Sequence, residues 1–135
     1  MIEFLQMSQV LDAVRATGTE VRYHHEHCND GKRAGFYRIG GGVDMLVICP
    51  ENNRNLSDLF DTIRHEAMHV VQACIGKPVL PYDYYLKNVS DATKQSLANY
   101  PQDLHTQHHE IEAHHAAEFG DEKLIVNTIN KFCFK

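Results

Sequence analysis

The segment RHEAMHVVQ, residues 64–72, holds two histidines and a glutamate in a pattern that could bind and use a metal ion. His65 and His69 are four residues apart, so in a helix their imidazoles lie on one face and can reach the same ion. Glu66 follows about 100° further round the helix, within reach of a water on that ion. The pattern predicts a catalytic zinc site in which Glu66 is the general base. Because the chain holds 10 histidines, the surrounding sequence must support this prediction.

The residues around the motif predict a buried helix over residues 56–74. Its apolar side chains cover much of its circumference, which is typical of a helix in a protein core. Buried imidazoles and a buried carboxylate without partners would cost several kcal/mol. A bound cation would remove that cost, which favours a metal over an accidental match. The apolar residues are Leu59, Phe60, Ile63, Ala67, Val70 and Val71.

A later helix, predicted over residues 103–119, offers a third ligand. On a helical wheel the polar residues of one side predict a solvated face: Gln107, Glu110, His114, Glu118 and Asp121. The opposite side collects the residues expected to pack inward: His105, His109, Glu112, Ala116 and Phe119. We therefore expect Glu112 to be the third metal ligand and Glu110 to point to solvent, because a packed carboxylate needs a charged partner. His109 shares the inner face and remains an alternative third ligand.

The combination of His65-Glu66-x-x-His69 with Glu110-Ile111-Glu112-Ala113 on a later helix resembles the gluzincin pattern of zinc metallopeptidases, in particular small bacterial and phage proteins with an E-x-E-A helix. The resemblance covers at most residues 33–119. It implies a minimal zincin-like fold, with zinc bound by the two histidines and a downstream glutamate. Carried over by position, the ligands are His65, His69 and Glu112, and the base is Glu66.

Three further residues could stabilise the transition state or support the ligands: His109, Tyr100 and Tyr85. Tyrosine and histidine can donate a hydrogen bond to a developing oxyanion, and all three lie near the ligand helices in sequence. The other histidines are expected not to contact the metal: His24, His25, His27, His114 and His115.

The size and composition are those of one ordinary domain over residues 1–135. Net charge is -5 and no basic stripe is present, so neither nucleic acid nor an anionic membrane is an expected partner. No apolar run is long enough to span a bilayer, and the first residues lack the pattern of a signal peptide. We therefore expect a cytoplasmic protein. Its four cysteines, which form no CxxC pair, are expected to be reduced thiols: Cys28, Cys49, Cys74 and Cys133.

The order of elements predicts an α+β fold. An N-terminal helix over residues 2–16 precedes strands at 19–27, 34–39 and 43–49, which most simply form an antiparallel meander. The helix that carries the motif follows, then an irregular aromatic segment and a short helix at 90–98. The sequence closes with the helix over 103–119 and a last helix at about 121–132.

The leading expectation is a zinc metallopeptidase that hydrolyses peptide bonds with a metal-activated water, on a peptide or protein substrate that adds to the strand at 43–49. A non-catalytic zinc-binding regulatory or interaction module is the main alternative. A metal-free interaction protein is a third interpretation, and it requires the motif to be coincidental.

Overall fold

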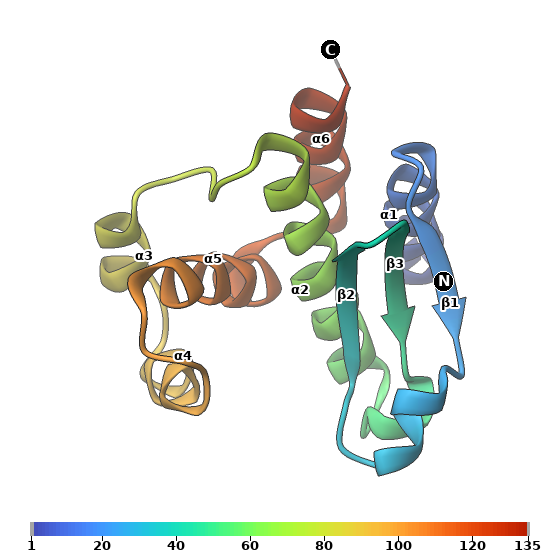
Figure 1. Cartoon of the computed structure of the whole chain (residues 1–135), viewed down its shortest axis with the longest axis horizontal. Coiled ribbons are helices and arrows are strands. Elements are labelled where there is room, and N and C mark those ends of the chain that lie inside the picture. Colours follow the sequence, from blue (N-terminus) through green and yellow to red (C-terminus); the bar gives the residue numbers. More distant parts are fainter. Residues whose placement is uncertain (1, 135) are drawn as a thin grey trace.

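The computed structural model describes residues 2–134, with side chains from residue 5 onward, so Met1 and Lys135 of the predicted domain lie outside the described residues. The described chain is an α+β arrangement of helices around one small sheet, as predicted (Figure 1). Its strands are β1 (Glu20–Tyr23), β2 (Gly35–Gly40) and β3 (Val43–Ile48). Its α-helices are α1 (Ile2–Ala16), α2 (Leu56–Ile75), α3 (Tyr82–Asn88), α4 (Asp91–Ser96), α5 (Leu104–Phe119) and α6 (Glu122–Cys133).

The sheet corrects the predicted antiparallel meander. Its strand order is β1-β3-β2, with β1 parallel and β2 antiparallel to β3. The most apolar strand therefore lies in the centre, where both of its edges are hydrogen-bonded. A substrate peptide cannot add to β3, contrary to the expectation for residues 43–49, whereas no strand of the described residues pairs with the outer edge of β2.

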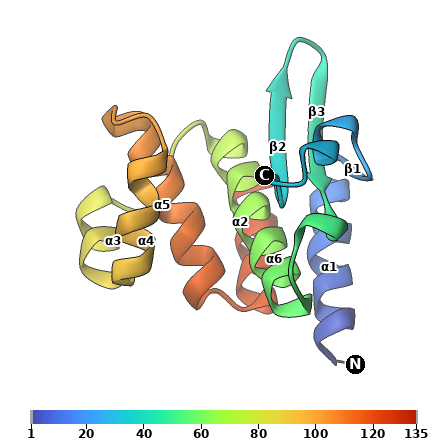
Figure 2. The same cartoon turned by 90° about the horizontal axis from the view of Figure 1, so that it is seen from below.

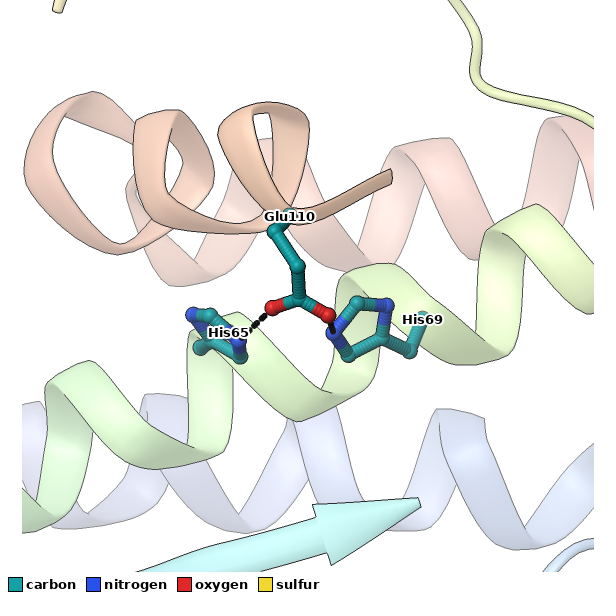
Figure 3. A group of neighbouring side chains, drawn as sticks. All are labelled: His65, His69 and Glu110. Carbon is teal, nitrogen blue, oxygen red and sulfur yellow. Dashed lines mark hydrogen bonds and ion pairs between the residues drawn. The ribbon is translucent and has the colours of Figure 1, made fainter. Parts of the chain in front are cut away.

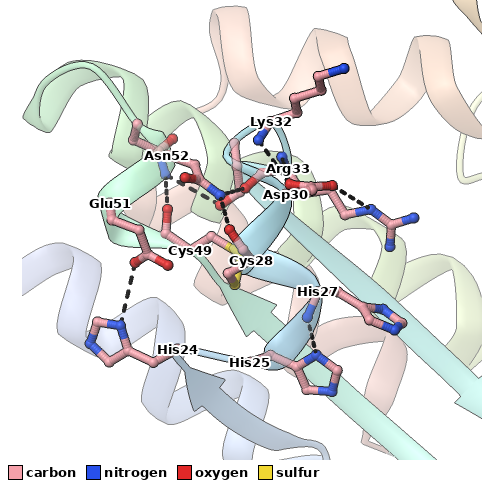
Figure 4. The surroundings of a disulfide bond; sticks show 12 residues. His24, His25, His27, Cys28, Asp30, Lys32, Arg33, Cys49, Glu51 and Asn52 are labelled. Carbon is pink, nitrogen blue, oxygen red and sulfur yellow. Dashed lines mark hydrogen bonds and ion pairs between the residues drawn. A yellow bond between two sulfur atoms is a disulfide. The ribbon is translucent and has the colours of Figure 1, made fainter.

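The chain between β1 and β2 explains why these strands do not form a hairpin. The predicted first strand ends at Tyr23, and a 3-10 helix, Glu26–Asp30, follows it. A disulfide joins Cys28 of this turn to Cys49 after β3, and Asn52 donates hydrogen bonds to the carbonyl oxygens of Cys28 and Arg33 (Figure 4). These links hold the segment between β1 and β2 against the end of β3. The two strands therefore lie on opposite sides of β3.

The prediction of free thiols is wrong, because the remaining cysteines are also paired. Cys74, at the end of α2, bonds to Cys133 at the end of α6, across 59 residues of sequence. Spacing alone could not reveal these partners, since neither pair is close in the chain.

Helix α2 lies at the centre of the molecule (Figures 1 and 2). Asn55 begins it by accepting a hydrogen bond from the backbone N–H of Asp58, and Gly76 ends it in the left-handed conformation that glycine adopts without strain. Its buried side chains join those of α1, α6 and β3 in the main core. In β3, Leu46 and Ile48 face this core, and alternation along the strand turns Met45 and Val47 to the smaller core under the Cys28–Cys49 disulfide.

Helix α5 packs between two sets of neighbours, which determines how its side chains are used. One side lies against α2, and the other lies against α3 and α4 (Figures 1 and 2). Helix α3 occupies the segment predicted to be irregular. Over the residues described, none of the helices combines the length and apolar character needed to cross a membrane.

Candidate metal centre

Three side chains from α2 and α5 converge on one point: His65, His69 and Glu110 (Figure 3). Nε2 of His65 lies 3.2 Å from Oε1 of Glu110, and Nε2 of His69 lies 3.2 Å from Oε2. The three ligand atoms are within 4.8 Å of one another. No other such group of histidine, cysteine or acidic residues occurs among the described residues.

The geometry of this cluster fits the donor set of an open zinc site. Zn–N distances of about 2.0–2.1 Å place two tetrahedral ligands roughly 3.3 Å apart, close to the two histidine–Glu110 separations of 3.2 Å, which involve different oxygens of Glu110. All three side chains are mostly buried, between 14% and 16% exposed. Two imidazoles and one carboxylate leave the fourth position of zinc open, as catalytic sites require.

Electrostatics within the cluster show how strongly the three groups interact without a metal. Burial alone lowers the pKa of His69, but the hydrogen bond to Glu110 and the charges of Glu66 and Glu110 outweigh it and raise this pKa to about 9. Burial raises the pKa of Glu110, but hydrogen bonds from His65 and His69 hold it well below its usual range. A divalent cation would replace the protons that these groups otherwise share.

Glu66 lies beside the cluster and lines a cavity of about 410 Å³ together with His65, Tyr100 and His114. The Glu66 residue is 8% exposed. Gly35 of β2 permits this close packing, because a Cβ there would stand 2.8 Å from Cγ2 of Thr62 and 3.6 Å from Cγ of Glu66. Glu66, the predicted general base, therefore lines the same cavity as His65 of the cluster.

Tyr100 and His114 also line this cavity. The Tyr100 hydroxyl lies 3.3 Å from Nε2 of His114, and the His114 ring packs edge-on against the ring of His65. Burial, together with the charges of Glu110 and Glu66, raises the pKa of Tyr100 well above its usual value, so its hydroxyl keeps its proton. Burial and the neighbouring His65 lower the pKa of His114 to about 4.

His114 is a residue that the sequence analysis missed. It lies one helical turn after Glu110, on the same side of α5, and it lines the cavity beside His65 instead of the predicted solvated face. Once Glu110 is recognised as part of the cluster, this spacing of four is the signal that could have found it.

The predicted third ligand, Glu112, is not in the cluster. Its carboxylate is 1% exposed and accepts four hydrogen bonds on the other side of α5. The donors are Nε2 of Gln72, the backbone N–H groups of Val79 and Leu80, and the hydroxyl of Tyr85. The expectation that a packed carboxylate needs a charged partner is wrong here, because four neutral donors satisfy it.

The prediction that Glu110 points to solvent is also wrong, because its carboxylate faces His65 and His69 of α2. Glu110 and Glu112 are separated by about 200° around the helix, so they face opposite neighbours. The prediction from the helical wheel required α5 to have one buried face, but α2 covers one side of this helix and α3 and α4 cover the other.

The other two candidates also differ from their predicted roles. His109 is not a ligand in the cluster: its Nδ1 lies 2.7 Å from the carbonyl oxygen of His105, and its ring packs against the ring of His105. Tyr85 contacts Glu112 rather than the cavity beside Glu66, and burial followed by that hydrogen bond raises its pKa. Tyr100 is the predicted oxyanion candidate that lies beside Glu66.

A second cavity, of about 350 Å³, also borders the cluster. His69 and Glu110 form part of its wall, and Tyr37 and Ile39 of β2 supply apolar surface. The histidines at residues 24, 25 and 27 surround the Cys28–Cys49 disulfide and take no part in either cavity (Figure 4).

Fold and site together describe an α+β domain with a two-histidine, one-glutamate cluster between two helices. The domain of unknown function DUF8637 matches residues 1–134, and the chain belongs to this family. No curated protein and no solved structure matches the chain.

Proposed function

We propose that this protein is a zinc-dependent metallopeptidase with a minimal zincin-like fold of the gluzincin type. The observation that carries the proposal is the convergence of His65, His69 and Glu110 beside the cavity that Glu66 lines. Glu110 takes the ligand role that the sequence resemblance assigned to Glu112. A structural zinc site would have no use for a carboxylate next to an open coordination position.

The residues around the cavity divide the hydrolysis between them. A zinc ion bound by the cluster would polarise the substrate carbonyl and lower the pKa of its water to about 7. Glu66 accepts a proton from the attacking water and delivers it to the nitrogen of the leaving amine as the C–N bond breaks. The Tyr100 hydroxyl, which keeps its proton, donates a hydrogen bond to the carbonyl oxygen as charge develops there.

The substrate in this proposal is an extended segment of a peptide or protein. The unpaired edge of β2 can accept it as an additional strand, since backbone N–H and C=O groups there have no partner strand. The two cavities border different members of the cluster and the same strand, the first at His65 and Gly35 and the second at His69, Tyr37 and Ile39. Side chains on both sides of the scissile bond therefore have space.

The two disulfides favour activity in an oxidising compartment over the cytoplasmic location expected from the sequence. Protein isolated from its native source with rapid thiol blocking should show no free thiol before reduction. Four free thiols after reduction and denaturation should then appear by mass spectrometry. Four blocked cysteines in the unreduced sample would restore the cytoplasmic assignment.

The experiment that tests the proposed function compares Glu66→Gln with the natural protein. The variant should keep its zinc, because Glu66 is not a ligand, and lose about 10²–10⁴-fold in peptide hydrolysis, the usual contribution of a general base. Zinc content by mass spectrometry and cleavage of an unfolded protein substrate are the two measurements. Glu26→Gln, a change on the turn before Cys28, is the control that should alter neither.

The same experiment separates the alternatives. Natural protein that binds zinc but cleaves nothing, with or without Glu66, would be the non-catalytic zinc-binding module. Protein purified without chelators or histidine tags that holds no zinc, and gains none on addition, would be the metal-free interaction protein. Undiminished cleavage by Glu66→Gln would rule out the mechanism.

A further inference from the structure

Gln72 lies three residues after His69 and connects it to the buried Glu112. Its Oε1 is 2.7 Å from Nδ1 of His69. Its Nε2 donates to Oε1 of Glu112 at 3.1 Å and to the carbonyl oxygen of His109 at 3.0 Å. Gln72 is 3% exposed, so water does not compete for these hydrogen bonds.

The partners of Gln72 determine which group donates in each hydrogen bond between His69, Gln72 and Glu112. The backbone carbonyl oxygen of His109 only accepts, so the amide nitrogen of Gln72 must face it, on the same side as Glu112. The amide oxygen must then face His69, and an amide oxygen only accepts. Nδ1 of His69 therefore donates to Gln72, and Nε2, which points at Glu110, is the nitrogen turned toward the cluster.

Glu112 is itself held from three segments of the chain. Its Oε1 accepts from Gln72 of α2, and its Oε2 accepts from the backbone N–H groups of Val79 and Leu80 and from the Tyr85 hydroxyl of α3. Every donor except Gln72 lies outside the metal cluster and its two helices. The hydrogen bonds from outside these helices hold the Glu112 carboxylate in place, and the carboxylate in turn holds the side-chain amide of Gln72.

We propose that Gln72 and Glu112 are positioning residues that hold His69 in the Nδ1-protonated form and direct its Nε2 to the metal. This inference rests on the proposed metal site and deepens it. It also gives Glu112 a role that its sequence position alone does not show: it supports a ligand through Gln72 instead of binding the metal.

The first test measures zinc affinity of Gln72→Leu by competition with a chelator. Loss of an outer hydrogen-bond partner of a ligating histidine typically weakens metal binding 10–100-fold, and we expect a loss in that range. Gln107→Leu is the matched control: Gln107 is a buried glutamine of α5 whose Nε2 donates to the carbonyl oxygens of Leu97 and Pro101, away from the cluster. That variant should bind zinc as the natural protein does.

The second test detects the proton on Nδ1 of His69 directly, by 1H–15N NMR of the histidine rings in metal-free protein. The natural protein and Gln107→Leu should show a slowly exchanging Nδ1–H resonance from His69. Gln72→Leu should lose it, and Glu112→Gln, which keeps Gln72 but disturbs its support, should show faster exchange. A general loss of folding would instead affect the backbone amide spectrum.

These measurements distinguish failure of the inference from failure of the proposed function. If natural protein binds zinc and both Gln72→Leu and Glu112→Gln bind it equally tightly, the positioning role is wrong and the metal site stands. If natural protein binds no zinc, the metal site is wrong, and the His69 resonance still tests the hydrogen-bond arrangement. An unchanged resonance in Gln72→Leu overturns the positioning role in either case.

Discussion

Two carboxylates on α5, Glu110 and Glu112, are two residues apart and both withdrawn from water, yet their surroundings differ in kind. Glu110 faces two imidazole nitrogens, which can exchange a proton for a metal ion. Glu112 faces two backbone N–H groups, a phenol and an amide, all of which donate hydrogen bonds to it and none of which is a usual zinc ligand. Burial of a carboxylate therefore does not identify a metal ligand; the chemistry of the groups opposite it is the better guide.

The comparison also separates two ways of stabilising a buried charge. Hydrogen bonds from four neutral donors satisfy Glu112 without any ion, which makes it a structural centre that joins α2, α3 and α5. Glu110 depends on charge in its neighbours, either protons on the histidines or a cation. The first arrangement is fixed by folding, and the second responds to what the protein binds.

The largest effect we expect is the loss of zinc binding in Glu110→Ala. Removal of one of three ligands should weaken binding by more than the roughly 100-fold upper range for an outer partner, equivalent to more than about 3 kcal/mol. Isothermal titration with zinc measures it. A larger loss in Glu112→Gln than in Glu110→Ala would reverse the two assignments.

The next effect concerns the stability of the metal-free protein. Here a change at Glu112 should cost more free energy of unfolding than a change at Glu110. Glu112→Gln puts an amide N–H₂ among four donors and leaves buried groups unsatisfied, at a cost of about 2 kcal/mol or more in the free energy of unfolding. Glu110→Gln should cost less, because its neighbours are histidines that can become neutral. Urea unfolding in the presence of a chelator compares the two variants, and equal costs would contradict the distinction.

The smallest expected effects are those of removing a hydroxyl from Tyr85, which contacts Glu112, or from Tyr100, which lines the cavity beside the cluster. Tyr85→Phe removes one hydrogen bond to a buried carboxylate and should lower the free energy of unfolding by roughly 1.5–3 kcal/mol, toward the lower end because three donors remain. Tyr100→Phe should change stability by less, since its hydroxyl faces the cavity. It should instead slow peptide hydrolysis. A Tyr100→Phe variant with natural activity would remove Tyr100 from the proposed mechanism.

Local signals in the sequence predicted the helices of the site closely. The apolar pattern predicts the motif helix at residues 56–74, and α2 spans Leu56–Ile75. The helix expected over 103–119 is α5, Leu104–Phe119. These signals act within a few residues of the chain, so they are visible without the fold.

Strand pairing was not predictable in the same way. The segment between Tyr23 and Gly35 contains a turn signal at residues 29–31, which is equally compatible with a hairpin. Only its link to Cys49 and Asn52, on the far side of β3, sends β1 to the parallel edge of the sheet. Each disulfide likewise joins cysteines that are far apart in the sequence and that only the fold brings together.

The sequence by itself determined that His65, Glu66 and His69 share one surface of a buried helix, because helical periodicity fixes the spacing of their side chains. Only the tertiary structure decided which glutamate meets them. Helix α5 is covered by α2 on one side and by α3 and α4 on the other, and a helical wheel shows which residues share a side but not which neighbour covers it. The packing of α5 against α2 turns Glu110 to the histidines and leaves Glu112 to the donors of Gln72, Val79, Leu80 and Tyr85.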